Sequence, residues 1–147
     1  MIKTVVKEFN QLTARELYFA LQLRSEVFVV EQNCVYQDLD GKDFKALHIM
    51  GFKNDELVAY TRIFRPNDYF EEASIGRVVV KENHRKYNYG ADIMMASIQA
   101  IKEHFNQTKI ILSAQTYLIR FYNDLGFYEV GETYLEDDIP HIKMVKD

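Results

Sequence analysis

The segment from residue 74 to residue 114 constrains the fold most, because two apolar runs flank a helical pattern there. SIGRVVVK (74–81) contains three consecutive valines, Val78 to Val80, which indicates a strand buried on both faces. From Gly90 onward apolar residues recur at helical spacing, and KIILSA (109–114) is apolar again. Strand, helix and strand in this order predict a βαβ unit with parallel strands and a right-handed crossover. We therefore expect the valine strand in the middle of a sheet.

The remaining chain predicts further strands and two more helices. Thr13 and Glu16 have the spacing of a capping box, so a helix should start there and end around Val29. Residues 31–43 and 82–88 are polar and are expected to form loops. Expected strands cover 3–7, 48–53, 57–64, 127–135 and 141–145, with a hairpin between the second and third, and a short helix covers 118–125 before Gly126. The expected fold class is α+β (α/β), with a central mixed β-sheet flanked by helices.

Length and composition limit the class of protein. The 147 residues, without a linker or repeat, are expected to form a single domain over 1–147. A net charge of −4 argues against a nucleic-acid partner, and no apolar stretch reaches the ~18 residues of a membrane span. Cys34 is the single cysteine, so an internal disulfide and a Cys/His zinc site are excluded. We expect a cytoplasmic protein with no metal and no membrane partner.

The loop after the valine strand has the chemistry of an anion site. A helix N-terminus carries unpaired N–H groups and about half a positive charge, which attracts phosphate. Arg85 and Lys86 add full charges beside it, while Gly90 and Ala91 are small enough for a phosphate to approach. Asn88 tolerates a left-handed turn. Phosphate binding is therefore expected here, although an ordinary strand-to-helix loop is the alternative, since one glycine is a weak signal.

Two motifs in this region carry a family resemblance. Residues 85–90 (RKYNYG) resemble the R/Q-x-x-G-x-G/A motif of the GNAT family of N-acetyltransferases, with Asn88 in place of the first glycine. Residues 120–132 (RFYNDLGFYEVGE) resemble the family's second motif, and we match Tyr122 to its tyrosine. The similarity extends over nearly the whole chain and points to the ElaA-type subgroup. The segments that carry it are LRSEVFVVEQ, DLDGKD, HIMGF, VAYTRI and YLEDDIPHIKM. No GxGxxG follows the first strand, so a Rossmann enzyme is not expected.

The resemblance implies a GNAT-like acyl-CoA N-acyltransferase fold that uses acetyl-CoA as cosubstrate. An acetyl group would pass directly from coenzyme A to an amine in a ternary complex. A β-bulge would splay the central strand from its neighbour and open a cleft for coenzyme A. The strand backbone would hold pantetheine, an N–H near Val79 would polarise the thioester, and the amides of 85–91 would cradle the pyrophosphate. The residues expected to bind the cosubstrate are Val78, Val79, Val80, Arg85, Lys86, Tyr87, Asn88, Tyr89, Gly90 and Ala91.

The resemblance also implies catalytic roles. Tyr122 would protonate the departing thiolate, because a phenol with its pKa near 10 suits that step; a packing role is the alternative. A base must take the proton of the amine, and Glu31 and His48 lead the candidates. Glu31 has the alternative of capping a helix, and His48 that of a satisfied core histidine. Further candidates are Glu72, Glu136 and His141, whereas Asp92 should point away from the phosphates.

Other functions remain open at this stage. A coenzyme A-binding regulatory domain without catalysis would not need Tyr122. A second alternative is a faint resemblance to acyl-homoserine-lactone synthases, which rests on Arg24, Phe28, the acids of DLDGKD and a Glu72/Arg77 pair. A purely structural protein is a third alternative. The expected acceptor is a small-molecule or protein amine, cationic and guided by an acidic rim of Glu31, Glu72, Glu136 and Asp137. Phe127, Tyr128 and Tyr134 are candidates for the surface of a homodimer.

Overall fold

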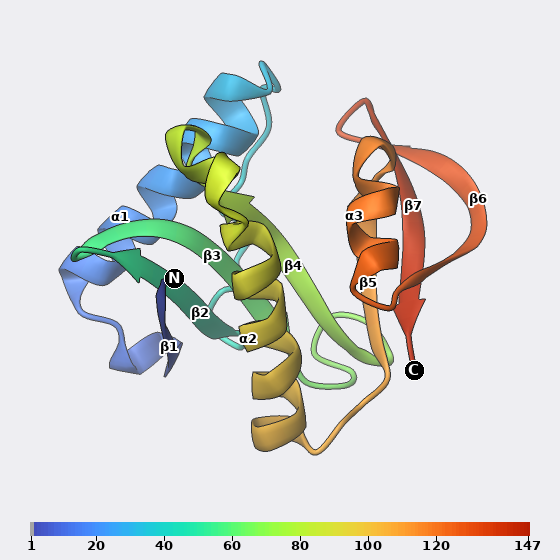
Figure 1. Cartoon of the computed structure of the whole chain (residues 1–147), viewed down its shortest axis with the longest axis horizontal. Helices are drawn as coiled ribbons and strands as arrows, with labels where there is room; N and C mark the ends of the chain where they lie inside the picture. The colour runs from blue at the N-terminus through green and yellow to red at the C-terminus, as the bar shows by residue number, and fades with distance from the viewer. Residues whose placement is uncertain (1) are drawn as a thin grey trace.

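A single seven-stranded sheet forms the centre of the computed structural model, which describes residues 2–147 (Figure 1). The strands are β1 (Lys3–Glu8), β2 (Leu47–Lys53), β3 (Glu56–Phe64), β4 (Ala73–Val80), β5 (Ile110–Gln115), β6 (Tyr128–Glu136) and β7 (Ile139–Lys146). Their spatial order is β1-β2-β3-β4-β5-β7-β6, so the valine strand β4 lies in the middle, as predicted. β4 and β5 pair in parallel, whereas the other neighbouring strands pair antiparallel. The predicted mixed sheet is therefore confirmed.

The helices are α1 (Ala14–Arg24), α2 (Tyr89–Phe105) and α3 (Ile119–Asp124). The capping box forms as predicted: the amide of Glu16 donates to Thr13 Oγ1 at 3.0 Å, and the amide of Thr13 donates to Glu16 Oε1 at 2.9 Å. Short 3₁₀ segments are η1 (Phe9–Gln11), η3 (Glu82–Tyr87) and η4 (Thr116–Leu118), and α1 continues as a π-helix, η2 (Ser25–Glu31). The helical segment thus ends two residues after the expected end around Val29, and the expected loop at 82–88 is corrected to a 3₁₀ segment followed by Asn88.

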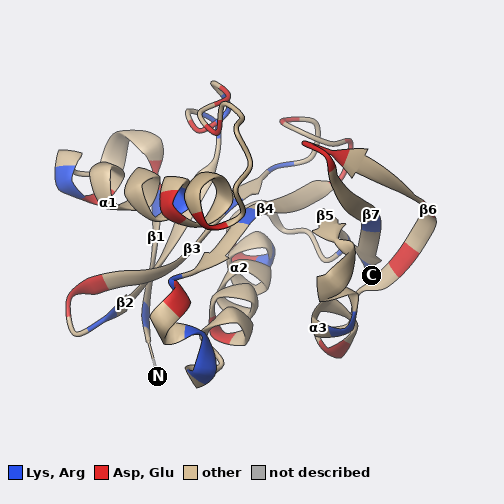
Figure 2. Cartoon of the chain, turned by 90° about the horizontal axis from the view of Figure 1, so that it is seen from above, with Lys and Arg blue, Asp and Glu red and all other residues tan. Residues whose placement is uncertain are grey.

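The helices cover both faces of the sheet. Figure 2 views the sheet from above, with α1 on one side of the strands and α2 and α3 on the other. On the first face α1 and η2 pack Ala20, Leu23 and Val27 against Met50, Leu57, Tyr60 and Val79. On the second face lies the larger cluster, which includes Ile49, Ala59, Ile63, Ile75, Ile93, Met94, Ile101, Leu112, Tyr122, Phe127 and Met144. Phe127 is only 2% exposed, so its expected place on a dimer surface is wrong.

The central strand is bulged at the expected place. Tyr60 pairs with Val79 and Arg62 pairs with Gly76, so Arg77 and Val78 together oppose Thr61 alone. Arg77 has a positive φ of 50°. β4 leaves β5 just before this irregularity: the two strands pair only at Ala73–Ile110 and Ser74–Ile111. The sheet thereby opens between an N-terminal half (2–105) and a C-terminal half (106–147).

Candidate active site

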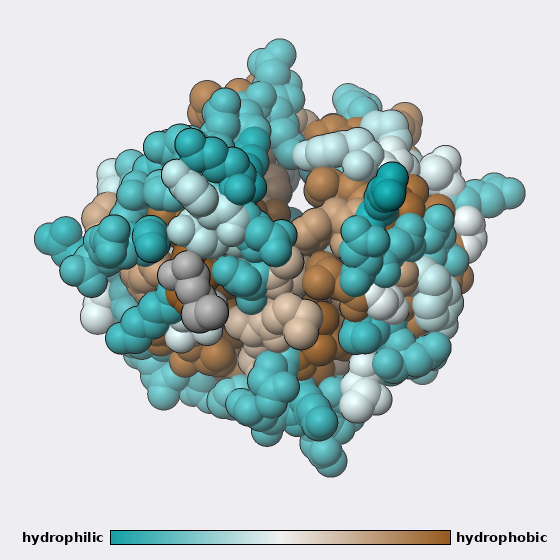
Figure 3. Space-filling view, viewed as in Figure 1, coloured by the Kyte–Doolittle hydropathy of each residue, from teal (hydrophilic) through white to brown (hydrophobic). Residues whose placement is uncertain are grey.

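A cavity of about 450 Å³ occupies the opening between β4 and β5. This volume is in the range of small-molecule binding sites. Figure 3 shows the molecule hollowed between its two halves, with apolar side chains around the hollow. Its walls come from η2 and the loop that follows, β4, the start of α2, β5, the segment 117–122 and the β6–β7 hairpin. Both halves of the molecule therefore contribute to one site.

The predicted cosubstrate-binding residues divide into two groups. Those that line the cavity are Val78, Val79, Val80, Arg85, Asn88 and Gly90. The side chains of Lys86, Tyr87, Tyr89 and Ala91 do not line it. Tyr89 is buried and stacks on His84 with ring centroids 6.2 Å apart, whereas Tyr87 is half exposed. Asp92 is also absent from the cavity wall, in agreement with its expected orientation.

The start of α2 has the geometry expected of an anion site. Asn88 adopts the left-handed conformation (φ 63°, ψ 25°), and its side chain does not cap the helix amides. Gly90 packs closely: a Cβ here would lie 3.3 Å from Phe121 Cζ, so that ring would have to shift by a few tenths of an ångström, and 3.8 Å from Val80 Cγ2, an ordinary contact. The glycine therefore brings α2, α3 and the end of β4 together at the cavity.

Arg85 and Glu31, which were predicted for different roles, form an ion pair. The Arg85 guanidinium donates to both carboxylate oxygens of Glu31, at 2.5 Å and 2.7 Å, and its Nε donates to the carbonyl of Val80 at 3.0 Å. Such bidentate pairs are directional and strong. Both Glu31 oxygens are thus engaged by Arg85, which makes Glu31 a poor base, and Arg85 brings no unmatched charge to a phosphate.

Tyr122 lies on α3 and lines the cavity. It is 4% exposed and packs edge to face against Phe121 and Phe127, with ring centroids 5.0 Å and 6.1 Å away. Burial raises the pKa of its phenol well above the usual range. The hydroxyl carries its proton at neutral pH, as a phenol does even without this shift, and the raised pKa makes it a weaker acid than a solvated tyrosine.

His48, the other predicted base, lies outside the cavity. It is 1% exposed, its Nδ1 lies 2.6 Å from the hydroxyl of Tyr60, and its Nε2 lies 3.0 Å from the carbonyl of Asp43. Burial lowers its pKa, which disfavours the imidazolium. The structure therefore supports the alternative of a satisfied core histidine, and the prediction of His48 as the base is not retained.

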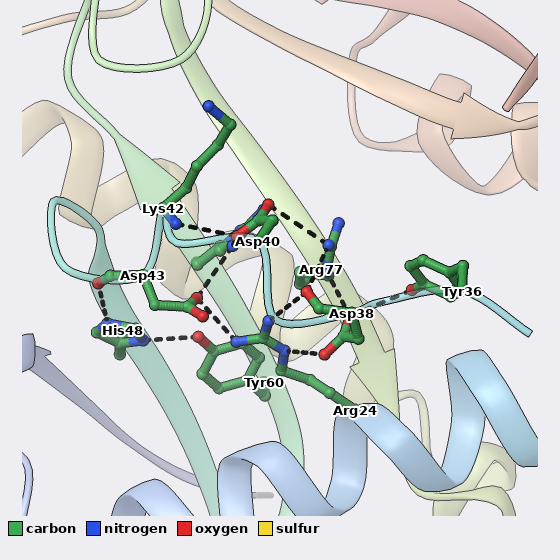
Figure 4. A network of polar contacts seen from close by, with 10 residues as sticks. Arg24, Tyr36, Asp38, Asp40, Lys42, Asp43, His48, Tyr60 and Arg77 are labelled. Atoms are coloured by element: carbon green, nitrogen blue, oxygen red, sulfur yellow. Dashed lines mark hydrogen bonds and ion pairs between the residues drawn. The ribbon is translucent and has the colours of Figure 1, made fainter. Parts of the chain in front are cut away.

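His48 adjoins a buried network of three arginines and three aspartates (Figure 4). Arg24 from α1 bonds to Asp38 at 2.9 Å and to Asp43 at 2.8 Å. Arg62 from β3 bonds to Asp40 at 2.6 Å and to Asp43 at 3.0 Å. The three carboxylates are the acids of DLDGKD (38–43), in the loop between η2 and β2. Sequence analysis noted them only for a family resemblance and did not predict their arginine partners. The network fastens that loop to the sheet.

The same network includes the bulged residue of β4. Arg77 Nε donates to Asp38 Oδ1 at 2.7 Å, and Arg77 lines the cavity. The expected Glu72/Arg77 pair is wrong, because Glu72 instead lies 4.0 Å from Lys109 and outside the cavity wall. Glu72 is consequently neither a base nor part of an acidic rim, whereas Glu31, Glu136 and Asp137 do line the cavity.

Glu136 and His141 meet on the C-terminal side of the cavity. The β6–β7 turn, with Asp137 and Asp138 at positive φ, aligns Tyr134 with His141. His141 Nδ1 lies 2.7 Å from the carbonyl of Ile139, and Nε2 lies 3.5 Å from Glu136 Oε2. The Tyr134 ring stacks on the imidazole, with centroids 6.2 Å apart, and its hydroxyl bonds to Ser113. Sequence reasoning named Glu136 and His141 only as further candidates, because their pairing depends on the hairpin register.

Two contacts join the halves across the cavity mouth. The side-chain amides of Gln32 and Gln115 exchange hydrogen bonds of 3.2 Å and 3.4 Å. The Cys34 thiol lies 3.3 Å from the carbonyl of Asp137.

Within residues 2–147, no group of three or more His, Cys, Asp or Glu is placed to hold a metal ion. None of the helices in this range is long and apolar enough to cross a membrane.

Comparison with known proteins adds independent information. The model of the family described as "Acetyltransferase (GNAT) domain" matches residues 9–147. Protein ElaA of Escherichia coli is 46% identical over 140 residues, covering 94% of this chain and 92% of that protein. Its crystal structure superposes with a TM-score of 0.92 over 100% of both chains, at 44% identity.

Two further structures are similar. An acyl-CoA N-acyltransferase from Pseudomonas aeruginosa has a TM-score of 0.91 at 41% identity, over 99% of both chains. An aminoglycoside 6'-N-acetyltransferase complexed with coenzyme A shares the fold, with a TM-score of 0.71 at 17% identity over 97% of this chain and 96% of that one. These similarities, together with the bulged central strand and the opening beside it, show that the chain belongs to the GNAT acetyltransferase family and is a close homologue of ElaA.

Proposed function

We propose that this protein transfers an acetyl group from acetyl-CoA to an amine, directly and within a ternary complex. The observation that carries the proposal is the opening of the sheet at the β4 bulge, with Tyr122 in its wall. Within residues 2–147, β4 has no strand partner on its β5 side after Ser74. The Val80 carbonyl there accepts a bond from Arg85 Nε. The remaining backbone groups of this stretch are proposed to bond to the amides of pantetheine, as the family resemblance implies for Val78 and Val80.

The pyrophosphate of acetyl-CoA is proposed to bind at the N-terminus of α2. Backbone N–H groups and the positive end of a long helix favour an anion at this position. Arg85 stands beside the site, held between Glu31 and the Val80 carbonyl. In this proposal its main task is to fix the loop geometry, and the backbone amides of 85–91 supply most of the phosphate contacts.

Tyr122 is proposed as the general acid. When the amine nitrogen attacks the thioester carbonyl, a C–N bond forms and the C–S bond breaks, so the electron pair leaves with sulfur. The phenol proton neutralises that thiolate. The hydroxyl is still protonated when the thiolate forms beside it, because a phenol does not ionise at neutral pH.

The acceptor is proposed to be a cationic amine of a small molecule or a protein. Glu136 and Asp137 line the cavity on the side opposite α2, and the chain carries a net charge of −4. Opposite charges near a binding site raise the local concentration of a charged substrate. This arrangement supports an acceptor entrance at the β6–β7 hairpin.

The test measures acetyl-CoA binding by calorimetry and acetyl transfer by thiol release. Wild-type protein should bind acetyl-CoA, and the double variant Arg85→Glu/Gly90→Glu should lose that binding, because it adds two negative charges and crowds Phe121. A variant with Lys102→Glu, at the far end of α2, serves as the control for charge alone. Unchanged affinity in the double variant would place the site elsewhere. Binding without transfer to any primary amine would favour the regulatory alternative.

A further inference from the structure

We propose that His141 is the proton acceptor for the attacking amine, oriented by the Ile139 carbonyl and assisted by Glu136. The inference rests on the acyl transfer proposed above and adds the residue that removes the proton from nitrogen. It follows from the tautomer, the neighbours and the position of one imidazole ring.

The Ile139 carbonyl determines the tautomer of His141. A carbonyl oxygen only accepts hydrogen bonds, so at 2.7 Å the Nδ1 of His141 must carry the proton and donate it. In the neutral ring the lone pair then resides on Nε2, which is the atom able to take a proton. The hairpin backbone thus holds the ring with its basic nitrogen in a known position.

Glu136 places a carboxylate beside that ring. Its Oε2 lies 3.5 Å from His141 Nε2, so a proton arriving on Nε2 faces a carboxylate. Tyr134 stacks on the ring and limits its rotation. His141 is only 6% exposed, yet it lines the cavity, so a substrate nitrogen in the cavity has access to it.

Other charged groups near the imidazole come from three elements. Asp137 belongs to the β6–β7 turn, and Lys143 lies two residues further along β7, opposite Ser113 on β5. Arg77 lines the cavity from β4, but its guanidinium is matched by Asp38. Glu136 is the carboxylate nearest to the ring by the contacts that the structure records.

The other base candidates are placed less favourably. Both oxygens of Glu31 accept bonds from Arg85, and His48 and Glu72 lie outside the cavity wall. Glu136 itself is 52% exposed in its side chain, so water stabilises its carboxylate. Among these candidates, His141 alone combines access to the cavity with a fixed lone pair.

The proton balance of the step is complete. The neutral amine uses its nitrogen lone pair to form the C–N bond, and the C–S electron pair leaves with coenzyme A. The attacking nitrogen of the cationic substrate first loses one proton to solvent, which gives the neutral amine. During the transfer its second proton moves from nitrogen to His141 Nε2, and one proton moves from the Tyr122 hydroxyl to sulfur. After product release, His141 returns its proton to solvent and Tyr122 regains one from solvent.

The first experiment compares His141→Ala and Glu136→Gln with His104→Ala and Glu132→Gln, two exposed control positions. The probes are acetyl-CoA with spermidine and with the amide of Nα-acetyl-lysine, followed by thiol release. We expect kcat/KM of His141→Ala to fall by roughly a hundredfold to ten-thousandfold, with acetyl-CoA affinity unchanged. Added imidazole should restore part of the rate, a result that a purely packing role would not produce. Glu136→Gln should lose on the order of tenfold, because only the neighbouring charge is removed.

The second measurement is independent of activity and of the acceptor. Nitrogen-15 NMR of the imidazoles, assigned with His141→Ala, should show neutral His141 with its proton on Nδ1. A proton on Nε2 would overturn the proposal, and so would a wild-type rate in His141→Ala. If the wild-type protein bound acetyl-CoA but acetylated neither amine, the proposed transfer to cationic amines would be wrong. The NMR result would still show independently whether Nε2 of His141 has the lone pair that accepts a proton.

Discussion

The two halves of the molecule differ in how their strands are covered. β3 in the N-terminal half is buried at every position after Glu56, because α1 covers one face and α2 the other. β6 in the C-terminal half is exposed along its whole length, and α3 covers one face of that half only. The doubly covered half is suited to hold the bulged strand rigidly. The open half leaves polar side chains free to reach the cleft.

The charged residues of the two halves differ in the same way. In the N-terminal half, arginines and aspartates neutralise one another beneath the loop 32–46. In the C-terminal half, Glu136 and His141 lie together in the cavity wall, where both side chains face the space proposed for the substrate. Buried ion pairs stabilise a fold only while both partners remain. Substitutions in the arginine–aspartate network of the first half should therefore affect stability, and substitutions at Glu136 and His141 in the second half should affect activity.

The largest effect is expected from Asp43→Ala. Asp43 accepts bonds from both Arg24 and Arg62, each of which is 1% exposed. Its loss leaves two buried guanidiniums short of a partner, so the free energy of unfolding should fall by about 3–5 kcal/mol in urea titrations. Glu132→Ala on exposed β6 is the control and should change little. Equal stability of both variants would contradict the division between the halves.

Tyr122→Phe should separate activity from stability. The hydroxyl is needed only when charge develops on sulfur, so turnover should fall about a hundredfold or more while acetyl-CoA affinity is retained. Turnover is measured by thiol release and affinity by calorimetry. Tyr128→Phe, on the exposed edge strand, is the matched control. An unchanged rate would assign Tyr122 to packing.

Acid should destabilise the N-terminal half first. Burial alone would raise the pKa of Asp40 and Asp43, but bonds to Arg62 and Arg24 outweigh it and hold both pKa values below the usual range. The ionised forms thus stabilise the fold above about pH 4, and that contribution is lost as pH falls through the lowered pKa values. Urea titrations between pH 7 and pH 3 measure it. Asp43→Asn should show a shallower decline than wild type, and an identical decline would contradict the assignment.

The smallest effect is expected at the acidic rim of the open half. With spermidine as acceptor, kcat/KM should decrease severalfold as salt rises past ~0.1 M, where screening shortens to about 10 Å. Asp137→Asn should reduce this salt dependence, and its backbone carbonyl should still bond to Cys34. Glu132→Gln, away from the cavity, provides the comparison. If neutral amines were better acceptors and their rates were indifferent to salt, the rim would have no role in guiding the substrate.

Local features of the fold were predictable because short-range contacts determine them. The Thr13–Glu16 capping box, the left-handed Asn88 and the positive φ of Gly126 depend only on neighbouring backbone groups. The π-helical extension to Glu31 was not predictable in this way. It depends on Val27 packing against Met50, Leu57, Tyr60 and Val79 on the face of the sheet that α1 covers, and on Arg85 binding Glu31 from 54 residues away.

The sequence by itself determined the order of elements, the buried valine strand, the family and the tyrosine proposed as the acid, because each follows from local pattern or motif. Only the tertiary structure decided which polar side chains meet. It paired Arg85 with Glu31, placed His48 in the core, and turned the acids of the loop toward three arginines. It also brought His141 beside Glu136 through the register of a two-residue hairpin. Charged groups act over a few ångströms, and such proximity depends on strand register and loop path, which one-dimensional spacing does not specify.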